Sequence, residues 1–452
     1  MFSPTLVPMT NGTDATRWVN WARTASSSPV RFDRPRDVPE LAASVADAAA
    51  QGLTVRAVGA GHSFTPAAVT DGVQLSLDAI DTLEDVHRRP DGTALVTVGA
   101  GIRLAALNGV LAALGLALRN LGDIDRQSIA GAISTGTHGT GARLGGLATQ
   151  VVGARLVTAS GEVVETSPTQ EPELFELARL GLGSAGVLAA VTLEAVPAFL
   201  LEAVEEPWPL DAVLEQLDGP DGLVEGNDHF EFYWFPHTRR ALTKRNNRVE
   251  AGAGLNPLRR WVDDELLSNT VFEATNRLVT AVPRVTRRVN AIAARSLSAR
   301  SYVARSPEVF ASPRRVRFRE MEYAVPREAL LDVLAEIDRW IESSGERLPF
   351  PAEIRFAAAD DLWLSTAHGR DTAYVAVHQY WRLPHERYFA AVERIVAEHA
   401  GRPHWGKLHG LDASRLAELY PRFADAQRVR AQADPTGVFD NDYLTRVFGP
   451  RP

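Results

Sequence analysis

The chain contains no cysteine. That absence excludes disulfides, thiolate nucleophiles, iron–sulfur clusters, cysteine-ligated zinc and cysteine-linked cofactors. The chain also lacks any stretch near the roughly 18 consecutive apolar residues that a membrane-spanning helix needs. Residues 1–16 have neither the basic start nor the apolar run of a secretory signal. We therefore expect a cytoplasmic protein without a membrane span.

The chain has fewer basic than acidic residues. Lys and Arg number 48 against 56 Asp and Glu, which gives a formal net charge of −8. This balance argues against nucleic acid or an anionic membrane as the main partner. A basic stretch over residues 284–305 is therefore interpreted as a solvated amphipathic helix.

Two common catalytic patterns are missing as well. No G-x-S-x-G elbow places a serine nucleophile, and no H-E-x-x-H pattern places a metal. Two of the 11 histidines, His404 and His409, lie five residues apart, off a single helical face, and we interpret them as structural. We expect no metal site.

The chain does contain a regular alternation of helix and strand signals. With 452 residues it is too long for one core, so about two or three domains are expected. Periodicity and turn residues predict helices over 40–51, 104–114, 172–180, 327–342 and 385–400, and strands over 54–58, 73–77, 94–98, 151–158, 161–165, 187–196, 229–235 and 315–325. The pattern predicts an α+β fold with one domain over residues 1–200, a second over 201–430, and a C-terminal segment, 431–452, that returns to the first.

The richest motif is residues 120–141, with the sequence NLGDIDRQSIAGAISTGTHGTG. It holds five glycines, three threonines and two serines, interrupted only by two short apolar pairs. Glycine lets the main chain approach a ligand closely, and successive N–H groups in such a loop form an anion-binding nest. The run therefore predicts a phosphate cradle, most plausibly for the pyrophosphate of a large cofactor. A purely structural glycine-rich turn is the alternative.

A second glycine pattern, residues 181–186, matches G-x-G-x-x-G literally. The dinucleotide-binding fingerprint needs a strand before the glycines and a helix after them, and here the predicted order is reversed. We interpret this run as a tight helix-to-strand connection.

Two phosphate-type loops, at 56–64 and 122–141, resemble the FAD-binding domain of the vanillyl-alcohol oxidase flavoproteins. The motifs EIR at 353–355, DDLWLS at 360–365, HQY at 378–380, HWGK at 404–407 and FDNDY at 439–443 resemble the sugar 1,4-lactone oxidoreductase branch of that family. This branch contains gulono-, galactono- and arabinono-lactone oxidases and dehydrogenases, with alditol oxidases as relatives. The resemblance covers residues 18–448 and implies a two-domain FAD-binding fold with an α+β substrate (cap) domain.

The resemblance also implies which residues hold FAD. His62 would be linked covalently to the flavin 8α-methyl group; a histidine that only packs beside the ring is the alternative. Gly186 and Val187 would reach the adenine end through backbone contacts. The implied cofactor-binding set is Arg56, Val58, Gly59, Ala60, Gly61, His62, Ser63, Phe64, Gly122, Asp123, Ser128, Gly131, Ser134, Thr135, Gly136, Thr137, His138, Gly139, Thr140, Gly141, Gly186, Val187, Asn441 and Tyr443.

Glu353 and Arg355 stand two positions apart on a predicted strand, so both point to one face. A carboxylate beside a rigid guanidinium fork can orient a polyol and hold an oxygen that loses its proton. By the resemblance, Lys407 would place a positive charge near the flavin N1–C2 carbonyl. His378 is a further candidate on the substrate side. The alternatives are a surface Glu–Arg pair and a solvated lysine.

The implied reaction is hydride transfer from C2 of an aldono-1,4-lactone, of the L-gulono-1,4-lactone type, to flavin N5. Gly122 aligns with the position beside flavin C4a where a small residue admits oxygen, so we expect an oxidase that makes hydrogen peroxide. A dehydrogenase with another acceptor and an alditol or polyol oxidase are the alternatives. A lactonase or carbohydrate-binding protein that keeps the fold without redox chemistry is a more distant one.

Overall fold

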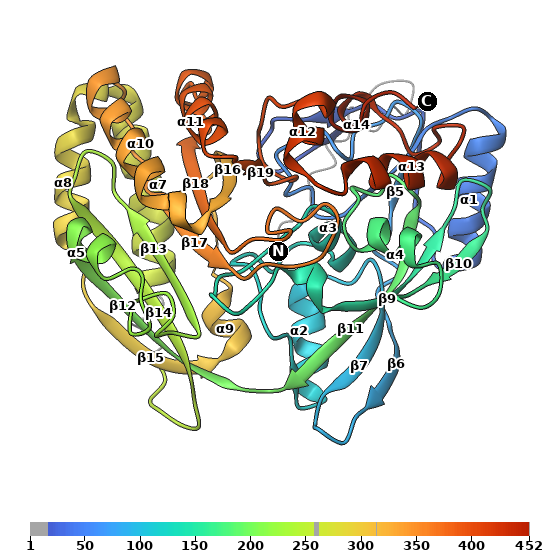
Figure 1. Ribbon diagram of the computed structural model, residues 1–452, viewed down its shortest axis with the longest axis horizontal. Coiled ribbons are helices and arrows are strands. Elements are labelled where there is room, and N and C mark those ends of the chain that lie inside the picture. Colours follow the sequence, from blue (N-terminus) through green and yellow to red (C-terminus); the bar gives the residue numbers. More distant parts are fainter. Residues whose placement is uncertain (1–16, 257–261, 313, 452) are drawn as a thin grey trace.

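The computed structural model describes residues 17–256, 262–312 and 314–451. Its two halves lie side by side, the N-terminal half together with the last helices on one side and the middle of the chain on the other (Figure 1). Among the described residues, no helix combines the length and apolarity needed to cross a membrane. The mixed architecture confirms the α+β prediction.

The N-terminal half begins with a small parallel sheet in the order β3 (Arg31–Asp33), β5 (Val73–Ser76) and β4 (Val55–Val58). Before it, β1 (Trp18–Val19) pairs with β2 (Ser26–Ser27). The crossover helix α1 (Val38–Ala50) starts at Asp37, whose side chain accepts a hydrogen bond from the amide of Glu40. This N-cap and the proline in the first helical turn explain why the helix begins there.

A second, antiparallel sheet follows in the order β10 (Val163–Thr166), β9 (Val151–Val157), β11 (Val187–Pro197), β7 (Ala94–Gly99) and β6 (Leu83–Arg88), with β8 (Leu116–Ala117) on β11. Its helices are α2 (Leu104–Ala113), α3 (Ile129–Ser134) and α4 (Pro172–Arg179), with the 3₁₀ turn η1 (Leu147–Gln150). Residues 180–186 connect α4 to β11, which confirms the helix-to-strand interpretation of the G-x-G-x-x-G match.

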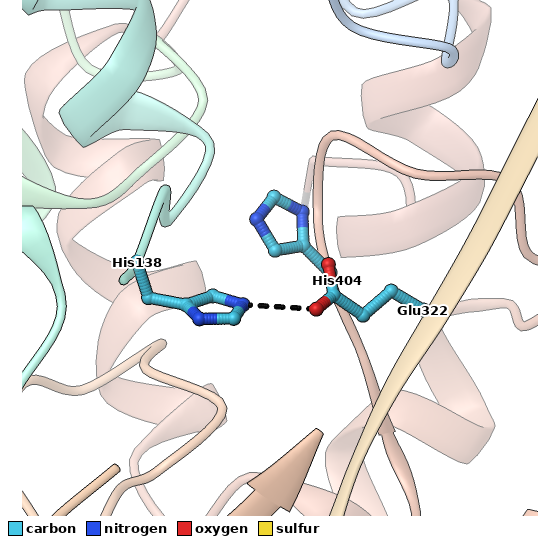
Figure 2. A group of neighbouring side chains, drawn as sticks. All are labelled: His138, Glu322 and His404. Carbon is cyan, nitrogen blue, oxygen red and sulfur yellow. Dashed lines mark ion pairs between the residues drawn. The ribbon is translucent and has the colours of Figure 1, made fainter. Parts of the chain in front are cut away.

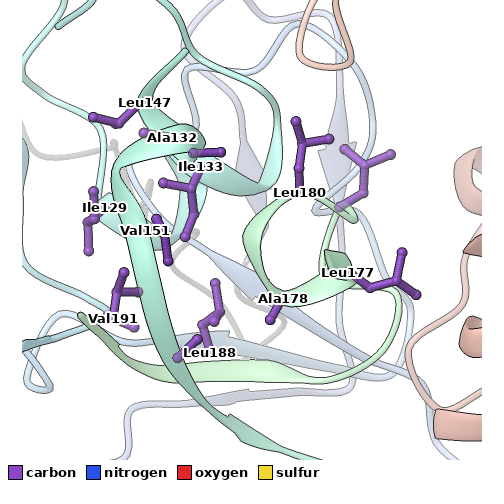
Figure 3. Packing of buried hydrophobic residues seen from close by; sticks show 14 of the residues in the cluster. Ile129, Ala132, Ile133, Leu147, Val151, Leu177, Ala178, Leu180, Leu188 and Val191 are labelled. Carbon is purple, nitrogen blue, oxygen red and sulfur yellow. The ribbon is translucent and has the colours of Figure 1, made fainter. Parts of the chain in front are cut away.

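Helix α3 was not predicted, because the glycine-rich run around it suggested a continuous loop. Ser128 caps α3 by accepting a hydrogen bond from the amide of Gly131. Three residues of the two apolar pairs are buried against the neighbouring sheet and α4: Ile129, Ala132 and Ile133 (Figure 3). The core therefore anchors the buried apolar residues of this run, and its other residues remain available for other contacts.

The other half is built on a long antiparallel sheet. Its order is β15 (Arg300–Arg305), β12 (Leu200–Pro209), β14 (Arg240–Val249), β13 (His229–Trp234), β17 (Ala352–Ala357), β18 (Thr372–Tyr380), β16 (Phe318–Pro326) and β19 (Arg402–Pro403). Its helical segments are α5 (Leu210–Glu215), η2 (Val262–Val271), α7 (Phe272–Ala281), η3 (Pro283–Val285), α8 (Thr286–Ser296), α9 (Ser306–Phe310), η4 (Arg327–Ala329), α10 (Leu330–Ser344) and α11 (Glu386–Glu398). The predicted basic helix over 284–305 is thus only partly right, because residues 300–305 extend the sheet as β15.

Side chains alternate strictly across the middle of this sheet. Phe230, Phe232, Ile354, Val375 and Val377 face α10 and α11 and form one apolar core. At the intervening positions, Glu353, Arg355 and His378 are polar or charged and face the N-terminal half, whereas Ala376 is small and apolar. Because side chains of a strand alternate between faces, one sheet surface is fixed by burial and the other is left for chemistry.

The last helices are α12 (Ala413–Leu419), α13 (Phe423–Ala433) and α14 (Asp442–Phe448). Leu416, Phe423 and Val429 belong to the hydrophobic core of the N-terminal half. All three of these helices therefore pack on the N-terminal half. The amide of Val55 also donates to the carbonyl of Val438 at 2.6 Å, which fastens the C-terminal segment to β4.

Candidate functional site

The structure contains two connected cavities. The first, which we call the glycine-loop cavity, lies within the N-terminal half and spans about 1060 Å³, including space open to solvent. It follows the loop after β4, the start of α3 and the connection before β11. Of the residues expected to bind the cofactor, its walls contain Arg56, Val58, Gly59, Ala60, Gly61, His62, Ser63, Ser128, Gly131, Ser134, Thr135, Gly186 and Val187. The two glycine loops predicted from the sequence therefore meet at one elongated cavity.

The loop after β4 offers unused hydrogen-bond donors. Within the described residues, the amides of Ala60, Gly61, His62 and Ser63 donate to no protein acceptor. Gly61 adopts φ +67°, a left-handed conformation that favours glycine. The buried indole nitrogen of Trp18 in the same wall also lacks a partner. Such a run of free donors fits the phosphate oxygens of a dinucleotide cofactor.

Close packing explains why position 59 of the same loop is a glycine. A Cβ atom on Gly59 would lie 2.4 Å from the hydroxyl oxygen of Ser128, the residue that caps α3. The two phosphate-type loops therefore touch each other at a point where no side chain fits.

Arg56 lines the glycine-loop cavity, but its guanidinium already donates four hydrogen bonds to the protein. It donates to the carbonyls of Ala67, Leu182, Gly183 and Phe439 at 2.6–3.2 Å. Burial lowers its pKa to about 10. Arg56 thus braces three chain segments around the cavity rather than presenting free donors to a phosphate.

Six residues of the expected cofactor set line neither cavity: Gly136, Gly139, Thr140, Gly141, Asn441 and Tyr443. Thr140 donates its hydroxyl to the carbonyl of Phe230 and accepts from the amide of Phe356, so it joins the glycine run to β13 and β17. The cofactor contacts expected for this end of the run stay a prediction, and in the structure Thr140 connects the two halves.

The cofactor contacts expected for Asn441 and Tyr443 also stay a prediction, and in the structure both side chains bond to protein groups. The side chain of Asn441 caps α14 and donates to the carbonyls of Pro66, Ala67 and Val69. The hydroxyl of Tyr443 is buried, 3.0 Å from the carbonyl of Trp405. Both residues support the wall of the cavity from behind.

The second cavity, which we call the charged cavity, lies between the two halves and spans about 770 Å³, including space open to solvent. It shares His62, Ser63, Gln127 and Thr135 with the first. Its walls also contain the expected residues Phe64, Gly122, Asp123, Thr137, His138, Glu353, Arg355, His378 and Lys407. Cofactor-type and substrate-type residues therefore face one continuous space.

His62 lies at the junction of the two cavities. Its ring stacks on Trp21, with 5.5 Å between the ring centroids. Burial, reinforced by the charges of Arg103 and Lys407, lowers its pKa to about 4. The imidazole is therefore neutral at physiological pH, and no described residue forms a hydrogen bond with it. A neutral ring nitrogen is the form that can bond covalently to carbon.

Sheet register assembles the wall of the charged cavity. Tyr233 pairs with Glu353, Glu353 with Ala376, and Ala376 with Glu322, across four adjacent strands. Each of these positions lies opposite the apolar face of the sheet. The small side chain of Ala376 in the middle of the row leaves space between the charged groups on either side.

Arg355 is the centre of a buried ion cluster. Its guanidinium contacts Glu353 directly, and its Nε and Nη2 atoms lie 3.0 Å from Glu231 and 3.5 Å from Asp123. Burial would lower the pKa of Arg355, but the three carboxylates raise it well above its usual value. Burial raises the pKa of Glu353, and Arg355 offsets this only in part. Glu353 is therefore a more basic carboxylate than usual.

A second ion cluster surrounds Lys407. Its ammonium lies 2.5 Å from Glu320 and 3.9 Å from Glu322. Burial would lower the pKa of Lys407, but the two carboxylates raise it above its usual value. The Nε2 atom of His378 lies 3.5 Å from Glu320, and its Nδ1 donates to the carbonyl of Pro351. Lys407 is thus a fixed cation in the cavity wall, not a solvated lysine.

His138, Glu322 and His404 form the far end of this cluster, within 4.8 Å of one another (Figure 2). His138 lies 3.2 Å from Glu322 and donates through Nδ1 to the carbonyl of Gly139. His404 accepts the amide of Gly406, and burial lowers its pKa to about 3. Because Glu322 is already balanced by His138 and Lys407, we interpret this group as a charge-compensated wall. His404 therefore lines the charged cavity, whereas His409 is buried against Tyr443, as expected for a structural group.

Sequence reasoning missed several functional candidates. Arg314 lies 2.6 Å from Asp123 in the charged cavity, and Glu320 and Glu322 hold Lys407. Glu231 and Tyr233 support the Glu353–Arg355 pair from β13. The signal was present: Glu231 and Tyr233 alternate with Phe230 and Phe232, and Glu320 and Glu322 alternate with Met321 and Tyr323. Charged residues at every second position of a strand mark one polar face, and only the structure shows that this face lines a cavity.

Comparisons with known proteins match both halves. A family model described as D-arabinono-1,4-lactone oxidase matches residues 191–447, and one described as FAD binding domain matches residues 29–167. The L-gulono-1,4-lactone dehydrogenase of Mycobacterium tuberculosis is 42% identical, covering 96% of this chain and 99% of that protein. The L-gulonolactone oxidase of Scyliorhinus torazame is 33% identical, covering 97% and 100%.

A third relative, the alditol oxidase of a Streptomyces species, is 33% identical and covers 95% of this chain and 98% of that protein. Among solved structures, cholesterol oxidase from B. sterolicum superposes with a TM-score of 0.80 over 98% of this chain and 100% of that one. At 18% identity that likeness shows the fold alone.

Proposed function

The chain belongs to the D-arabinono-1,4-lactone oxidase family of FAD-dependent enzymes that oxidise a CH–OH group of an aldonolactone, and we propose that it oxidises the C2 hydroxyl of an L-gulono-1,4-lactone-type substrate in the charged cavity. One observation carries the proposal. The Glu353–Arg355 pair faces the same space as His62, the residue where the two cavities meet.

The glycine-loop cavity fits FAD. The free amides of residues 60–63 and the unpartnered indole nitrogen of Trp18 would hold the pyrophosphate, and Ser128 and Gly131 would line its other side. We further propose that His62 carries the flavin covalently, because its ring is neutral and stands at the junction of the cavities. Bound FAD supplies a two-electron acceptor that takes a hydride at N5.

The substrate residues act on the hydroxyl that loses its proton. Arg355 donates hydrogen bonds to the developing alkoxide from a rigid, always charged fork. Glu353 accepts the hydroxyl proton, since burial makes this carboxylate more basic than usual. Tyr233, whose hydroxyl lies 3.0 Å from Glu353, fixes its orientation. Lys407 supplies positive charge on the opposite wall.

For the electron acceptor, we propose that oxygen is admitted beside Gly122 and leaves as hydrogen peroxide. Gly122 lines the charged cavity, and any side chain there would point toward the methyl group of Thr137 and the carbonyl of His138. The relatives named oxidase support this route, and the relative named dehydrogenase supports a second acceptor besides oxygen.

A substrate panel tests the assignment. Gulono-, galactono- and arabinono-1,4-lactones are compared with xylitol and sorbitol, once with oxygen alone and once with an artificial acceptor. We expect the lactones to be turned over with the higher kcat/KM. Faster oxidation of xylitol would favour the alditol oxidase function, the candidate that the Streptomyces relative supports. A purified protein that is colourless and does not take up FAD would end the redox assignment.

A further inference from the structure

A partly exposed tryptophan on the substrate half, Trp381, is surrounded by arginines. The guanidinium groups of Arg23, Arg317 and Arg382 lie 5.4, 5.5 and 4.7 Å from the ring centroid of Trp381. Arg23 and Arg382 are exposed, and Trp381 and Arg317 are partly exposed. We call these four residues the Trp381 patch. The patch combines segments that lie far apart in the sequence.

The positive charge of the patch is not compensated. Within the described part of the chain, none of its three arginines forms an ion pair or a side-chain hydrogen bond. The carboxylate that acts on Arg317 is Glu273, which already binds Arg277 and the hydroxyl of Tyr380. Burial and the charge of Arg23 lower the pKa of Arg317. Cations held this close without counterions form a surface that attracts anionic groups.

Arg23 is held in place at a conformational cost. Its φ of +59° lies in the left-handed region, which residues with a side chain seldom adopt. Asn20 enforces the turn, because its side chain accepts the amides of Thr24 and Ala25 while donating to Thr24. Strained residues of this kind persist where the surrounding structure over-determines them, and they concentrate at functional sites.

The same turn is bonded directly to the loop that carries His62. The amide of Trp21 donates to the carbonyl of Gly61, and the side chains of Asn20 and Thr24 donate to the carbonyls of Ser63 and Phe64. The ring of Trp21 stacks on His62 itself. The turn that carries Arg23 of the Trp381 patch is therefore joined, through Trp21, to the junction of the two cavities.

We propose that the Trp381 patch docks an electron-accepting protein that presents carboxylates around its redox centre. Tryptophan and arginine are the residues that dominate binding at the centres of protein interfaces, which favours a protein over a small ion. The inference rests on the proposed function for its electron source. Oxidation of one lactone hydroxyl to a ketone releases two electrons and two protons; two one-electron acceptor molecules take the electrons, and the protons go to solvent.

The experiment measures the two half-reactions of the holoenzyme separately, by anaerobic stopped flow. Bleaching of the flavin by a lactone reports the first. Reoxidation of dithionite-reduced enzyme reports the second, with plastocyanin as the acidic acceptor protein, cytochrome c as a basic one and ferricyanide as a small anion. The variants are Arg382→Glu, the double variant Arg23→Glu/Arg382→Glu, and Arg88→Glu as a matched control on exposed β6.

We expect the double variant to lower the second-order rate constant with plastocyanin by roughly 10–100-fold at low salt, and the difference to shrink at high salt. Flavin reduction by lactone, and reoxidation by oxygen, should stay within about twofold of wild type. Cytochrome c should not be slowed, and Arg88→Glu should leave plastocyanin unchanged within about twofold.

An unchanged rate with plastocyanin, or an equal loss in Arg88→Glu, overturns the docking site. A loss with ferricyanide and none with plastocyanin also overturns it, because the patch would then only gather small anions. If lactones fail to bleach the flavin, the proposed function is wrong, yet the dithionite arm still decides whether the patch docks an acidic protein.

Discussion

Replacing Arg355 should lower the activity of the enzyme while its flavin stays bound. In Arg355→Leu the substrate oxygen loses a charged donor, a change that typically costs about 3–4 kcal/mol of transition-state stabilisation. We therefore expect kcat/KM for the preferred lactone to fall by roughly 10²–10³-fold. The flavin should stay bound, because Arg355 lines only the charged cavity.

The same substitution removes a cation that three carboxylates share. Asp123 keeps Arg314 at 2.6 Å and Glu231 keeps Lys244 at 3.4 Å, but Glu353 keeps no other direct cation among the described residues. Breaking a buried pair costs about 3–5 kcal/mol, and we expect the lower end here because two carboxylates remain paired. The pKa of Glu353 should rise further, since Arg355 now lowers it.

A double variant distinguishes the two effects. Arg355→Leu/Glu353→Gln removes the unpaired carboxylate and should recover about 1–2 kcal/mol of the lost unfolding free energy without recovering activity. Arg245→Leu is the matched control, since Arg245 pairs with Glu206 on the same sheet outside both cavities and should keep kcat/KM within about twofold. The measurements are steady-state kinetics, urea unfolding and flavin absorbance.

Two results would refute the reasoning. One is an Arg355→Leu enzyme whose kcat/KM stays within about threefold of wild type. The other is a double variant that regains wild-type turnover, because Arg355 would then serve only to neutralise Glu353.

Three further outcomes are expected. His62→Ala should release its flavin into the supernatant on acid precipitation, whereas wild type should keep a yellow pellet; a yellow pellet from the variant would rule out this attachment. In Gly122→Ala the new Cβ would lie 3.1 Å from the Thr137 methyl carbon, so reoxidation by oxygen should fall by roughly tenfold, or about 1.4 kcal/mol, with ferricyanide unaffected. Burial raises the pKa of Asp360 to about 6. A carboxyl whose pKa is raised in the folded state stabilises the fold below about pH 4, and this contribution is lost as the pH rises through about 6. The loss amounts to at most about 3 kcal/mol of unfolding free energy. Urea unfolding measured as a function of pH should show this loss in wild type and not in Asp360→Asn.

The sequence was sufficient for features that depend on near neighbours. Strand periodicity placed Glu353 and Arg355 on one face, and their contact in the structure follows from that spacing. Turn residues and glycines located the loop at 56–64 and the start of the second loop. The order of helix and strand around residues 181–186 excluded a dinucleotide fingerprint, and the structure shows the same order.

Only the tertiary structure decided how the glycine-rich run of residues 120–141 is used. Its composition is uniform, yet Ser128 and Thr135 face the glycine-loop cavity, Gly122 and His138 face the charged cavity, and Thr140 joins the two halves. The partners that decide these roles come from strands more than 80 residues away, such as β13 and β17. A local sequence pattern indicates which conformations a segment can adopt. The contacts of that segment depend on where distant strands place their side chains, and a short stretch of sequence does not contain this information.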